Sequence, residues 1–401
     1  MTIPTVSIIV PCRNEQAHIH ARVRSILRQD LPPEEFEIIV ADGMSGDGTR
    51  DILQQLAAEA PCLRVIDNPG RIVSTGLNTA IRVARGSVIV RMDAHTEYAS
   101  DYVRQCLTVL RETGADNVGG PARTKSQGTL QSAICVAYHS PFAVGGARFH
   151  QVEYEGYVDA VPYGCWPRKV FDQIGLFDEE LVRNQNDEFN LRLTWVGGKI
   201  WQSPRIQSWY RPRSSLRCLF RQYMQYGYWK VRVIQKHRMP ASVRHLLPGS
   251  FALVLIVLPL LSLWWPVAAW AWLGLIGLYS MCNVTVSLLI AARQAWILLP
   301  LLPLAFACYH CSYGYGFLRG VWDFVNLQRG PHPTQQISQS TENRIKPSIN
   351  TTPSKGGTVG SRGFSTPHRV LIRLEMVRRH GAKARHDDTA GQHSRRGGQR
   401  R

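Results

Sequence analysis

An acid and a histidine stand two positions apart near the middle of the N-terminal half. Asp93 and His95 follow the small and β-branched residues 87–90, a composition typical of a short buried parallel strand. In open α/β sheets ligands bind beyond the carboxyl ends of the strands, so these two side chains can share one divalent metal. A metal there neutralises the diphosphate of an activated donor. The structural alternative is that Asp93 caps a helix beginning near Ser100 and that His95 is an ordinary loop residue.

A second acid, Asp42, ends another apolar run and opens the glycine-rich loop 42–49. Asp42 can accept hydrogen bonds from the base or ribose of a nucleotide whose phosphates lie near Asp93. The loop does not match the dinucleotide fingerprint, and no phosphate-binding P-loop pattern occurs in the chain. The alternative interpretation is that Asp42 and Asp47 only form a turn, a role for which acids beside glycines are well suited.

Alternating strands and helices position these acids. Each predicted helix returns the chain to the start of the next strand, which requires right-handed crossovers and a mostly parallel sheet of the α/β class. After residue 118 the alternation becomes irregular, and the glycine-rich segment that follows is expected to face an acceptor. The predicted strands are residues 6–10, 36–40, 63–66 and 87–90, and the clearest helices are residues 76–85 and 102–110.

Two further acids, Asp187 and Glu188, open a short predicted helix that runs toward Trp195. A carboxylate near a bound sugar can remove the proton from an attacking hydroxyl. Acids at a helix N-terminus are also favourable for dipole reasons alone, so the pattern by itself leaves both interpretations open.

The C-terminal half contains a membrane-like region. Residues 214–237 mix basic and aromatic side chains in one predicted helix, a composition that suits a membrane interface. Three apolar runs follow, each near the ~20 residues that a helix needs to cross a bilayer. The basic approach to the first run places residues 1–245 in the cytoplasm. The apolar runs are residues 246–265, 267–290 and 295–317.

The formal net charge of +18 is concentrated outside the predicted sheet. The residues after Gly330 hold 14 Lys and Arg against 4 acids, whereas the N-terminal half is close to neutral. A nucleic-acid-binding face is therefore not indicated. The tail is rich in Ser, Thr, Gly, Gln and Arg and is predicted to be disordered. The 9 scattered cysteines, with no secretory signal before them, are predicted to be reduced.

These boundaries predict four parts. They are a cytoplasmic α/β domain at residues 1–213, a basic interfacial helix at 214–245, transmembrane helices at 246–320 and a basic disordered tail at 321–401.

Taken together, the motifs resemble the family 2 inverting glycosyltransferases of the GT-A fold, most closely the membrane-bound succinoglycan-type exopolysaccharide members. The resemblance runs from about Val6 to Gly320. Asp42 looks like the family's nucleotide-base aspartate, and Asp93-Ala-His95 looks like its metal motif, which implies Mg²⁺ or Mn²⁺. The opening strand and turn, residues 7–15, are similar as well. The residues that this resemblance implies for donor binding are Pro11, Arg13, Asn14, Glu15, Asp42 and Asp93.

The same resemblance implies the catalytic and acceptor residues. In the family an acidic pair carries the catalytic base; here Asn186 occupies one position of that pair, so the base is Asp187 or Glu188, and we favour Asp187. Residues 225–229 are similar to the Q-x-x-R-W motif of polysaccharide synthases, but Tyr228 replaces the arginine, which favours a single transfer over processive polymerisation. The implied acceptor residues are Gln225, Tyr228 and Trp229.

The implied function is transfer of a sugar, with inversion, from a nucleoside diphosphate sugar, expected to be UDP-linked, to a sugar on a polyprenyl diphosphate. The implied process is exopolysaccharide or cell-envelope glycan synthesis, and the implied location is the inner (cytoplasmic) membrane, with several spans and a cytoplasmic catalytic domain. Other polysaccharide synthesis proteins are further expected partners. Two alternatives remain at this point. One is an enzyme that charges polyprenyl phosphate with a single sugar; the other is a catalytically degenerate scaffold that binds nucleotide sugar without transfer.

Overall fold

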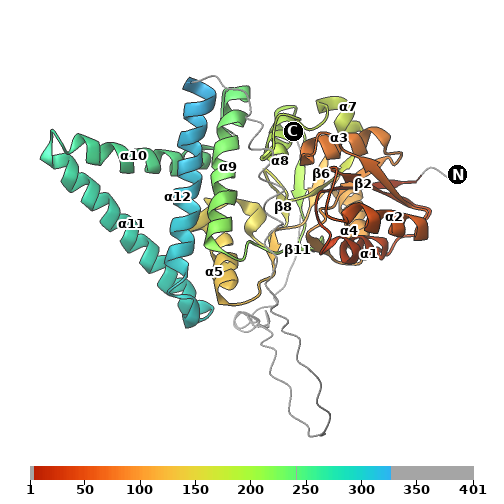
Figure 1. Cartoon of the computed structure of the whole chain (residues 1–401), viewed down its shortest axis with the longest axis horizontal. Helices are drawn as coiled ribbons and strands as arrows, with labels where there is room; N and C mark the ends of the chain where they lie inside the picture. Colours follow the sequence, from red (N-terminus) through yellow and green to blue (C-terminus); the bar gives the residue numbers. More distant parts are fainter. Residues whose placement is uncertain (1–3, 241, 327–401) are drawn as a thin grey trace, which may run out of the picture. The chain divides into compact units, whose positions relative to one another are not determined.

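A mostly parallel sheet forms the N-terminal part of the computed structural model, which describes residues 4–240 and 242–326 (Figure 1). Its 8 strands have the order β3-β2-β1-β4-β9-β6-β10-β8. The first four strands in the chain are parallel, whereas β9 is antiparallel to both of its neighbours and β8 is antiparallel to β10. The predicted α/β class is confirmed. The strands are β1 (Val6–Cys12), β2 (Phe36–Asp42), β3 (Leu63–Asp67), β4 (Val88–Arg91), β6 (Asn117–Gly119), β8 (Gly156–Tyr157), β9 (Gly164–Pro167) and β10 (Ile200–Gln202).

The central strands read as continuous apolar runs because both faces of the sheet are covered. Alternate residues point to opposite faces, so Ile8 and Val10 join one core cluster and Ile9 joins another. The first face packs against α1 (Ile19–Leu27), α2 (Thr49–Glu59) and α4 (Tyr102–Thr113), and the second against α3 (Val73–Val83), α7 (Lys169–Ile174) and α8 (Gln185–Trp195). This packing holds the carboxyl ends of β1, β2 and β4 at one rigid edge.

A second, smaller sheet lies beyond that edge. It has the order β5-β11-β7 and follows directly from the turn after β4. Two short helices come next in the chain and pack toward the C-terminal helices. The elements are β5 (Thr96–Tyr98), β7 (Arg123–Thr124), β11 (Ser208–Tyr210), α5 (Thr129–Tyr138), α6 (Pro141–Val144) and a 3-10 turn at Arg148–His150.

The predicted basic helix is α9 (Leu216–His237), which begins where the Ser215 hydroxyl accepts a hydrogen bond from the Cys218 amide. It lies alongside α12 (Leu302–Gly320) (Figure 1). The two backbones are in direct contact, since a Cβ on Gly316 would overlap the Met224 carbonyl oxygen. Much of the apolar face of α9 is therefore covered by protein.

Replacing Gly316 with alanine is expected to destabilise the protein. The added Cβ has no room beside the Met224 carbonyl, and overpacking of this kind typically costs about 1–3 kcal/mol. Gly277→Ala on α11 is the matched control, because nothing lies within 4 Å of the Cβ that it adds. Thermal unfolding of the full chain in detergent should show a lower Tm for Gly316→Ala and no loss for Gly277→Ala. Equal Tm values would contradict the tight α9–α12 packing.

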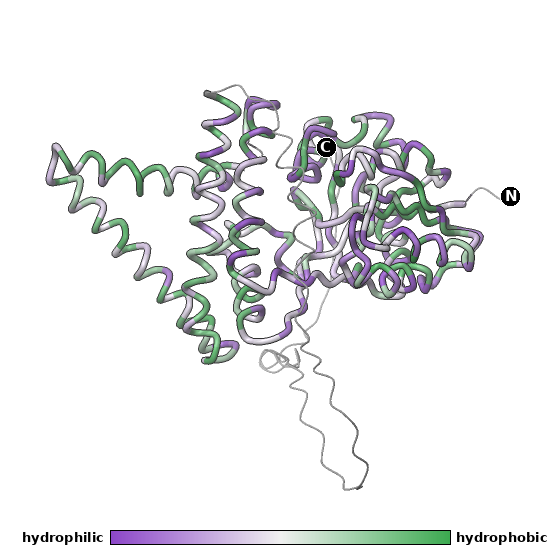
Figure 2. Tube along the Cα trace, viewed as in Figure 1, coloured by the Kyte–Doolittle hydropathy of each residue, from purple (hydrophilic) through white to green (hydrophobic). Residues whose placement is uncertain are grey.

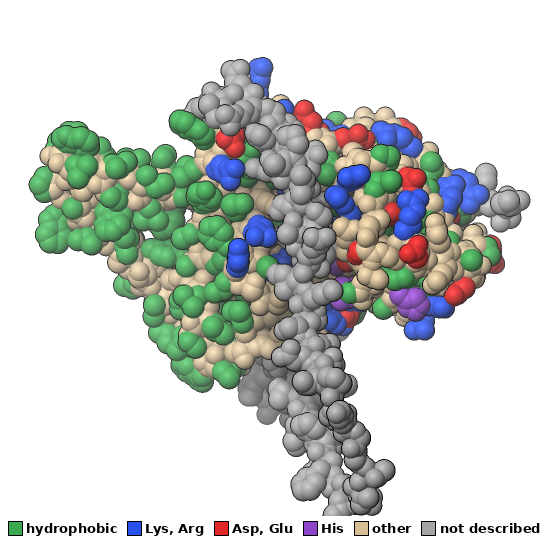
Figure 3. Space-filling model, in the orientation of Figure 1, with side chains coloured by type: hydrophobic (Ala, Val, Ile, Leu, Met, Phe, Trp, Pro, Cys, Tyr) green, Lys and Arg blue, Asp and Glu red, His purple; other side chains and the backbone are tan. Residues whose placement is uncertain are grey.

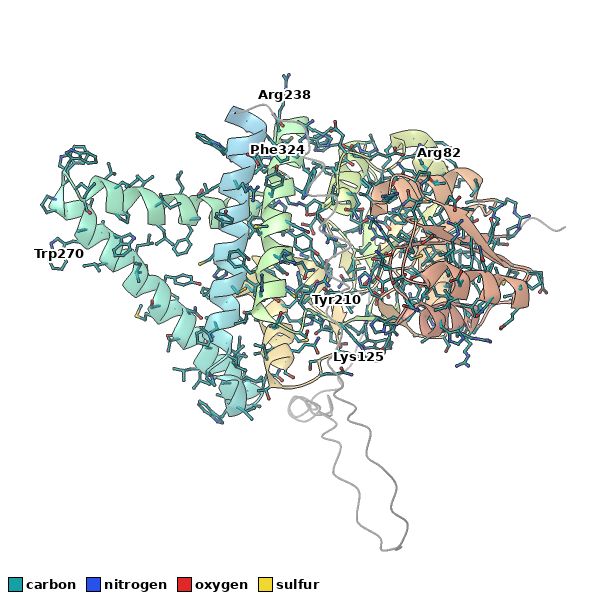
Figure 4. The ribbon with its side chains drawn as sticks, in the orientation of Figure 1. Arg82, Lys125, Tyr210, Arg238, Trp270 and Phe324 are labelled. Atoms are coloured by element: carbon teal, nitrogen blue, oxygen red, sulfur yellow. The ribbon has the colours of Figure 1, made fainter. Side chains whose placement is uncertain are left out.

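Two helices carry the exposed apolar surface. They are α10 (Leu247–Leu261) and α11 (Pro266–Arg293), whose surfaces are dominated by hydrophobic side chains (Figures 2 and 3). Trp270 projects outward from α11 and is 74% exposed (Figure 4). By length and composition, Val243–Leu261 and Pro266–Arg293 can each cross a membrane.

The prediction of three transmembrane helices is not confirmed. Among the described residues only two helices meet that standard. The third apolar run is divided into a 3-10 turn at Trp296–Leu298 and α12. The reason lies in composition, because His310, Arg319 and several Tyr and Gly interrupt the apolar residues of α12. This helix buries Phe306, Tyr309 and its glycines against α9, α10 and α5.

The helix also continues into the region predicted as tail. Val321–Asn326 form a π-helical turn, and Phe324 is buried against Tyr228 and Trp229 (Figure 4). The remaining predicted tail, residues 327–401, lies outside the described residues. All nine cysteines are described and none forms a disulfide, in agreement with the prediction that they are reduced.

Candidate active site

One cavity of about 660 Å³ opens beyond the carboxyl end of β4, between the small sheet, α8 and the C-terminal helices. Tyr210 of β11 is one of its lining residues and stands between the α/β part and these helices (Figure 4). The cavity wall contains most of the chemistry-bearing side chains discussed below. Its charged lining residues are Arg91, Asp93, Arg123, Asp159, Arg183, Asp187, Arg213, Lys230 and Arg244.

Asp93 lies in the turn between β4 and β5, and its carboxylate is held by Arg91. Arg91 Nε and Nη2 donate to the two oxygens of Asp93 at 2.8 and 3.0 Å, and the arginine side chain is 6% exposed. The Asp93 amide donates to the Tyr98 hydroxyl at 2.6 Å. Burial raises the pKa of Asp93, but the charges of Arg91 and His95 and the Arg91 hydrogen bonds outweigh it, so the net shift is downward. Asp93 is therefore ionised at neutral pH.

His95 lines the same cavity, with its ring edge-on to Tyr210 at a centroid separation of 6.1 Å. One side of the ring faces the cavity, and protein surrounds the rest of it. Burial lowers the pKa of His95, the charge of Asp93 raises it, and the arginines at 213, 91 and 183 lower it further; the net shift is downward. The imidazole is thus neutral at neutral pH, the form that binds metals.

The pair fits a divalent cation that also takes ligands from a substrate. No group of three or more His, Cys, Asp or Glu side chains suited to a metal occurs among residues 4–240 and 242–326. Mg²⁺ usually keeps only one or two protein carboxylates and completes its shell with substrate phosphates and water. Asp93 and the neutral His95 can supply these few protein ligands. A bound cation would then share the Asp93 oxygens with Arg91.

Asp187 and Glu188 are separated by the structure. Both belong to the first turn of α8, which starts after Asn184 in a left-handed conformation. The Asp187 side chain faces the cavity, is 41% exposed to it and accepts a hydrogen bond from Lys230 Nζ at 2.5 Å. Glu188 is 2% exposed, lies away from the cavity and pairs with Arg192 and His237 at 2.6 and 3.0 Å.

The pKa of Asp187 is lowered. Burial alone raises it, but the charge and hydrogen bond of Lys230, together with the charge of Arg244, outweigh burial. The carboxylate is therefore ionised at neutral pH and able to accept a proton.

Asn186 stands where the family resemblance implies an acid, and it connects the Asp93 side of the site to the Asp187 side. Arg91 Nη1 donates to its side-chain oxygen at 2.6 Å, and its own Nδ2 donates to the Pro162 carbonyl at 2.8 Å. Because Asp93 already balances the charge of Arg91, a neutral amide is sufficient at this position. Asn186 thus couples the end of β4 to the start of α8.

Apart from Asp93, the residues expected at the nucleotide lie at the same sheet edge but do not line the cavity. Asp42 pairs with Cys12 in the β1–β2 register, next to Pro11, and is completely buried. Its carboxylate accepts hydrogen bonds from the amide and hydroxyl of Ser45.

The turn after β1 is tied to the turn after β2. The Gly46 amide donates to the Asn14 side chain and the Glu15 amide donates to Thr49 Oγ1. Arg13 reaches the Arg71 carbonyl at 3.4 Å. The structure therefore gives these residues a part in shaping the loops around Asp42, and their part in nucleotide binding stays a prediction.

The predicted acceptor residues on α9 also point away from the cavity. Gln225 accepts a hydrogen bond from Arg183 Nε at 2.9 Å. It therefore holds Arg183, which lines the cavity, from outside the cavity. The Tyr228 hydroxyl donates to Asp323 at 3.1 Å, and Trp229 is 1% exposed. The α9 residues that do line the cavity are Leu219, Gln222, Tyr223, Tyr226 and Lys230.

Sequence reasoning missed several lining residues that come from separate elements. Arg183 opens the stretch that resembles the family's acidic segment, but Arg213, Arg244, His245 and Tyr313 belong to no local motif. The only sequence signal was the crowding of basic residues between positions 205 and 244, which composition alone assigns equally to lipid headgroups.

Comparison with known proteins places this site in context. A model of the glycosyl transferase family 2 matches residues 7–173. The succinoglycan biosynthesis protein ExoA of Rhizobium meliloti (strain 1021) is 31% identical over 330 residues, which are 81% of this chain and 97% of that protein. A Methanococcus voltae dolichyl N-acetyl-alpha-D-glucosaminyl phosphate 3-beta-D-2,3-diacetamido-2,3-dideoxy-beta-D-glucuronosyltransferase is 28% identical over 327 residues, covering 79% of this chain and 97% of its own length.

Among solved structures, the mannosyltransferase PcManGT from Pyrobaculum calidifontis, determined with GDP-Man and Mn²⁺, has a similar fold. The TM-score is 0.53 with 19% sequence identity, and the match covers 80% of this chain and 88% of that chain. At this identity the likeness concerns the fold alone.

Proposed function

Because the chain belongs to the family 2 glycosyltransferases, we propose that it transfers a sugar from a nucleoside diphosphate sugar to a lipid-linked acceptor, with inversion. The process is exopolysaccharide or other cell-envelope glycan synthesis, and the donor is UDP-linked. One observation carries the proposal: Asp93, His95 and Asp187 open into a single cavity that continues to the apolar helices α10, α11 and α12.

The donor end of the site is the region around Asp93. Asp93 and His95 would hold Mg²⁺ or Mn²⁺, and a bound cation would supply positive charge that stabilises the departing diphosphate. Arg91 keeps the Asp93 carboxylate oriented, and Asn186 keeps Arg91 oriented. Arg183 and Arg213 add positive charge near His95. Pro11, Arg13, Asn14, Glu15 and Asp42 form the loops on which the nucleoside rests.

Asp187 acts as the general base at the other end. Its ionised carboxylate removes the proton of the acceptor hydroxyl as that oxygen attacks the anomeric carbon. The bond from the anomeric carbon to the nucleoside diphosphate breaks on the opposite side, which inverts the configuration. Glu188 has no part in this step, since its ion pairs with Arg192 and His237 hold it away from the cavity.

The membrane part of the proposal rests on α10 and α11. Both helices expose apolar surface, and α10 together with the 3-10 turn before it (Val243–Leu261) and α11 are each long enough to cross a bilayer. We place the chain in the inner (cytoplasmic) membrane as a multi-pass protein with its catalytic domain in the cytoplasm, where nucleotide sugars are found. A lipid-linked acceptor then reaches the cavity from the side of these helices.

The direct test is release of UDP from UDP-glucose by membranes that contain the full chain, with and without Mn²⁺. We expect UDP release to require both the cation and an acceptor lipid. If UDP-glucose gives no release, other nucleotide sugars are tested in the same way. Analysis of the lipid product identifies the acceptor. If the product is polyprenyl phosphate that carries a single sugar, the acceptor is polyprenyl phosphate itself and not a lipid-linked sugar. Intact nucleotide binding without transfer from any donor would refute the proposed activity.

The pH dependence of the reaction tests the role of Asp187. A base with a lowered pKa is active above that pKa, so kcat/KM should fall only below the ordinary Asp value of 3.8. Removing the opposing charge with Lys230→Met leaves burial as the main influence, which raises the pKa. The acid limb of the kcat/KM profile should therefore move to higher pH in this variant. An acid limb at the same pH in both proteins would contradict the assignment.

A further inference from the structure

The cavity carries more positive charge than its own acids balance. Six Lys and Arg side chains but only three Asp side chains line it. Because an enclosed, water-poor space strengthens each of these charges, the excess favours anionic ligands. One bound nucleoside diphosphate can neutralise this excess charge only if all the cations lie close together.

The cations form two groups instead. His95 experiences the charges of Arg91, Arg183 and Arg213. Asp187 experiences those of Lys230 and Arg244, with the His245 imidazole beside them. The first group surrounds the donor end described above. The second group surrounds the base, where the proposed mechanism requires no phosphate of the donor.

The second group also contains polar atoms that have no partner. Within the described part of the chain, His245 Nδ1 and the Tyr313 hydroxyl are buried and make no hydrogen bond, although both residues line the cavity. Buried polar groups are normally satisfied, so unsatisfied ones indicate a missing ligand. Arg244 contacts Asp159 through Nη2, and that carboxylate is itself 49% exposed. The Arg244 side chain also lines the cavity.

An apolar wall begins one turn after this group. Arg244 and His245 belong to the 3-10 turn Val243–His245, which leads directly into α10. Leu247, Pro248 and Phe251 of α10 continue the cavity lining, and Tyr279 of α11 joins them. A ligand held at Arg244 by an anionic group can therefore extend an apolar chain along α10 toward its exposed hydrophobic surface (Figure 3).

We propose that Arg244, His245, Lys230 and Tyr313 form a second phosphate site, distinct from the donor end, which binds the phosphate or diphosphate of a prenyl-type lipid and presents the attached sugar to Asp187. This inference rests on the proposed function for the identity of the other ligand, the nucleoside diphosphate. It assigns the acceptor end of the cavity to residues from α9, the turn before α10, and α12, in place of Gln225, Tyr228 and Trp229.

The test is calorimetric titration of the detergent-solubilised full chain with farnesyl diphosphate, in the presence and absence of saturating UDP and Mn²⁺. Arg244→Met and His245→Phe should each weaken binding by about 10- to 100-fold, the range expected for one hydrogen bond to a charged group. Arg217→Met is the matched control, because Arg217 lies on the exposed side of α9 and does not line the cavity. It should bind as the wild type does. Farnesol should bind equally weakly to all four proteins.

Other outcomes overturn the inference. Equal farnesyl diphosphate affinity in the wild type and both cavity variants would remove the site. Loss of binding when UDP is added would place the diphosphate at the donor end. Inorganic pyrophosphate binding as tightly as the farnesyl ester would assign the site to a soluble anion. If Arg244→Met does not fold because of its contacts with Asp159 and Gly145, His245→Phe still decides the question. The titration needs no turnover, so it can succeed even if the sugar transfer proposed above is refuted.

Discussion

Asp187→Asn is expected to reduce sugar transfer by about 10²- to 10⁴-fold, the usual contribution of a general base. The amide keeps the shape of the carboxylate and can still accept the hydrogen bond from Lys230, but it cannot take a proton. Donor binding should be unchanged, because the donor residues cluster around Asp93 at the other end of the cavity. The measurements are kcat for the full chain with acceptor lipid and the Kd for the nucleotide.

Glu188→Gln is the matched control for this prediction. It removes the same kind of charge from the adjacent residue, but Glu188 is buried against Arg192 and His237 and does not line the cavity. We expect Glu188→Gln to lower the Tm and to leave the kcat of the folded fraction within about tenfold of wild type, because losing a buried partner mainly affects stability. Full turnover by Asp187→Asn, or loss of catalysis in Glu188→Gln at unchanged stability, would reverse the assignment.

Asp93→Ala is expected to abolish cation-dependent donor cleavage and also to destabilise the fold. The loss of activity should be at least about 10²-fold, because charge stabilisation of the leaving group depends on this carboxylate. The loss of stability has a separate cause: Arg91 is buried, and without Asp93 its charge has no counter-ion. Removing one partner of a buried ion pair typically costs about 3–5 kcal/mol.

The double variant Arg91→Met/Asp93→Ala separates these two effects. Replacing both members of a buried pair by apolar groups is often neutral for stability, so the double variant should recover most of the lost Tm. It should not recover donor cleavage. Recovery of both properties would show that Asp93 only neutralises Arg91, and the metal site would then have to be placed elsewhere. Thermal unfolding and UDP release on the same preparations provide both readouts.

Local sequence patterns were enough to predict the sheet and the residues at its edge. The strands β1 to β4 are short apolar runs that end at polar residues, and the helices between them make these strands parallel, so the pattern alone puts Asp42 and Asp93 at one edge. The same local reasoning placed Asp187 in the first turn of a helix.

Tertiary packing decided which of these residues face the cavity. Neighbouring residues on a helix point in directions about 100° apart, so the choice between Asp187 and Glu188 depended on which side of α8 meets the cavity. The same holds for α9. Gln225 contacts Arg183 before α8, Tyr228 contacts Asp323 in the π-helical turn and Trp229 packs on Phe324, while Lys230 faces the cavity.

The sequence by itself determined the α/β fold, the family and two of the three predicted transmembrane runs, because each of these follows from composition, periodicity or motifs read along the chain. The role of α12 depended on glycines that admit the backbone of α9, a contact between residues about 90 positions apart in the chain. Lys230, Arg244 and His245 likewise come together only when α9 meets the turn before α10. Such long-range contacts leave no periodic signal in the sequence, and for that reason only the tertiary structure could bring these side chains to one cavity.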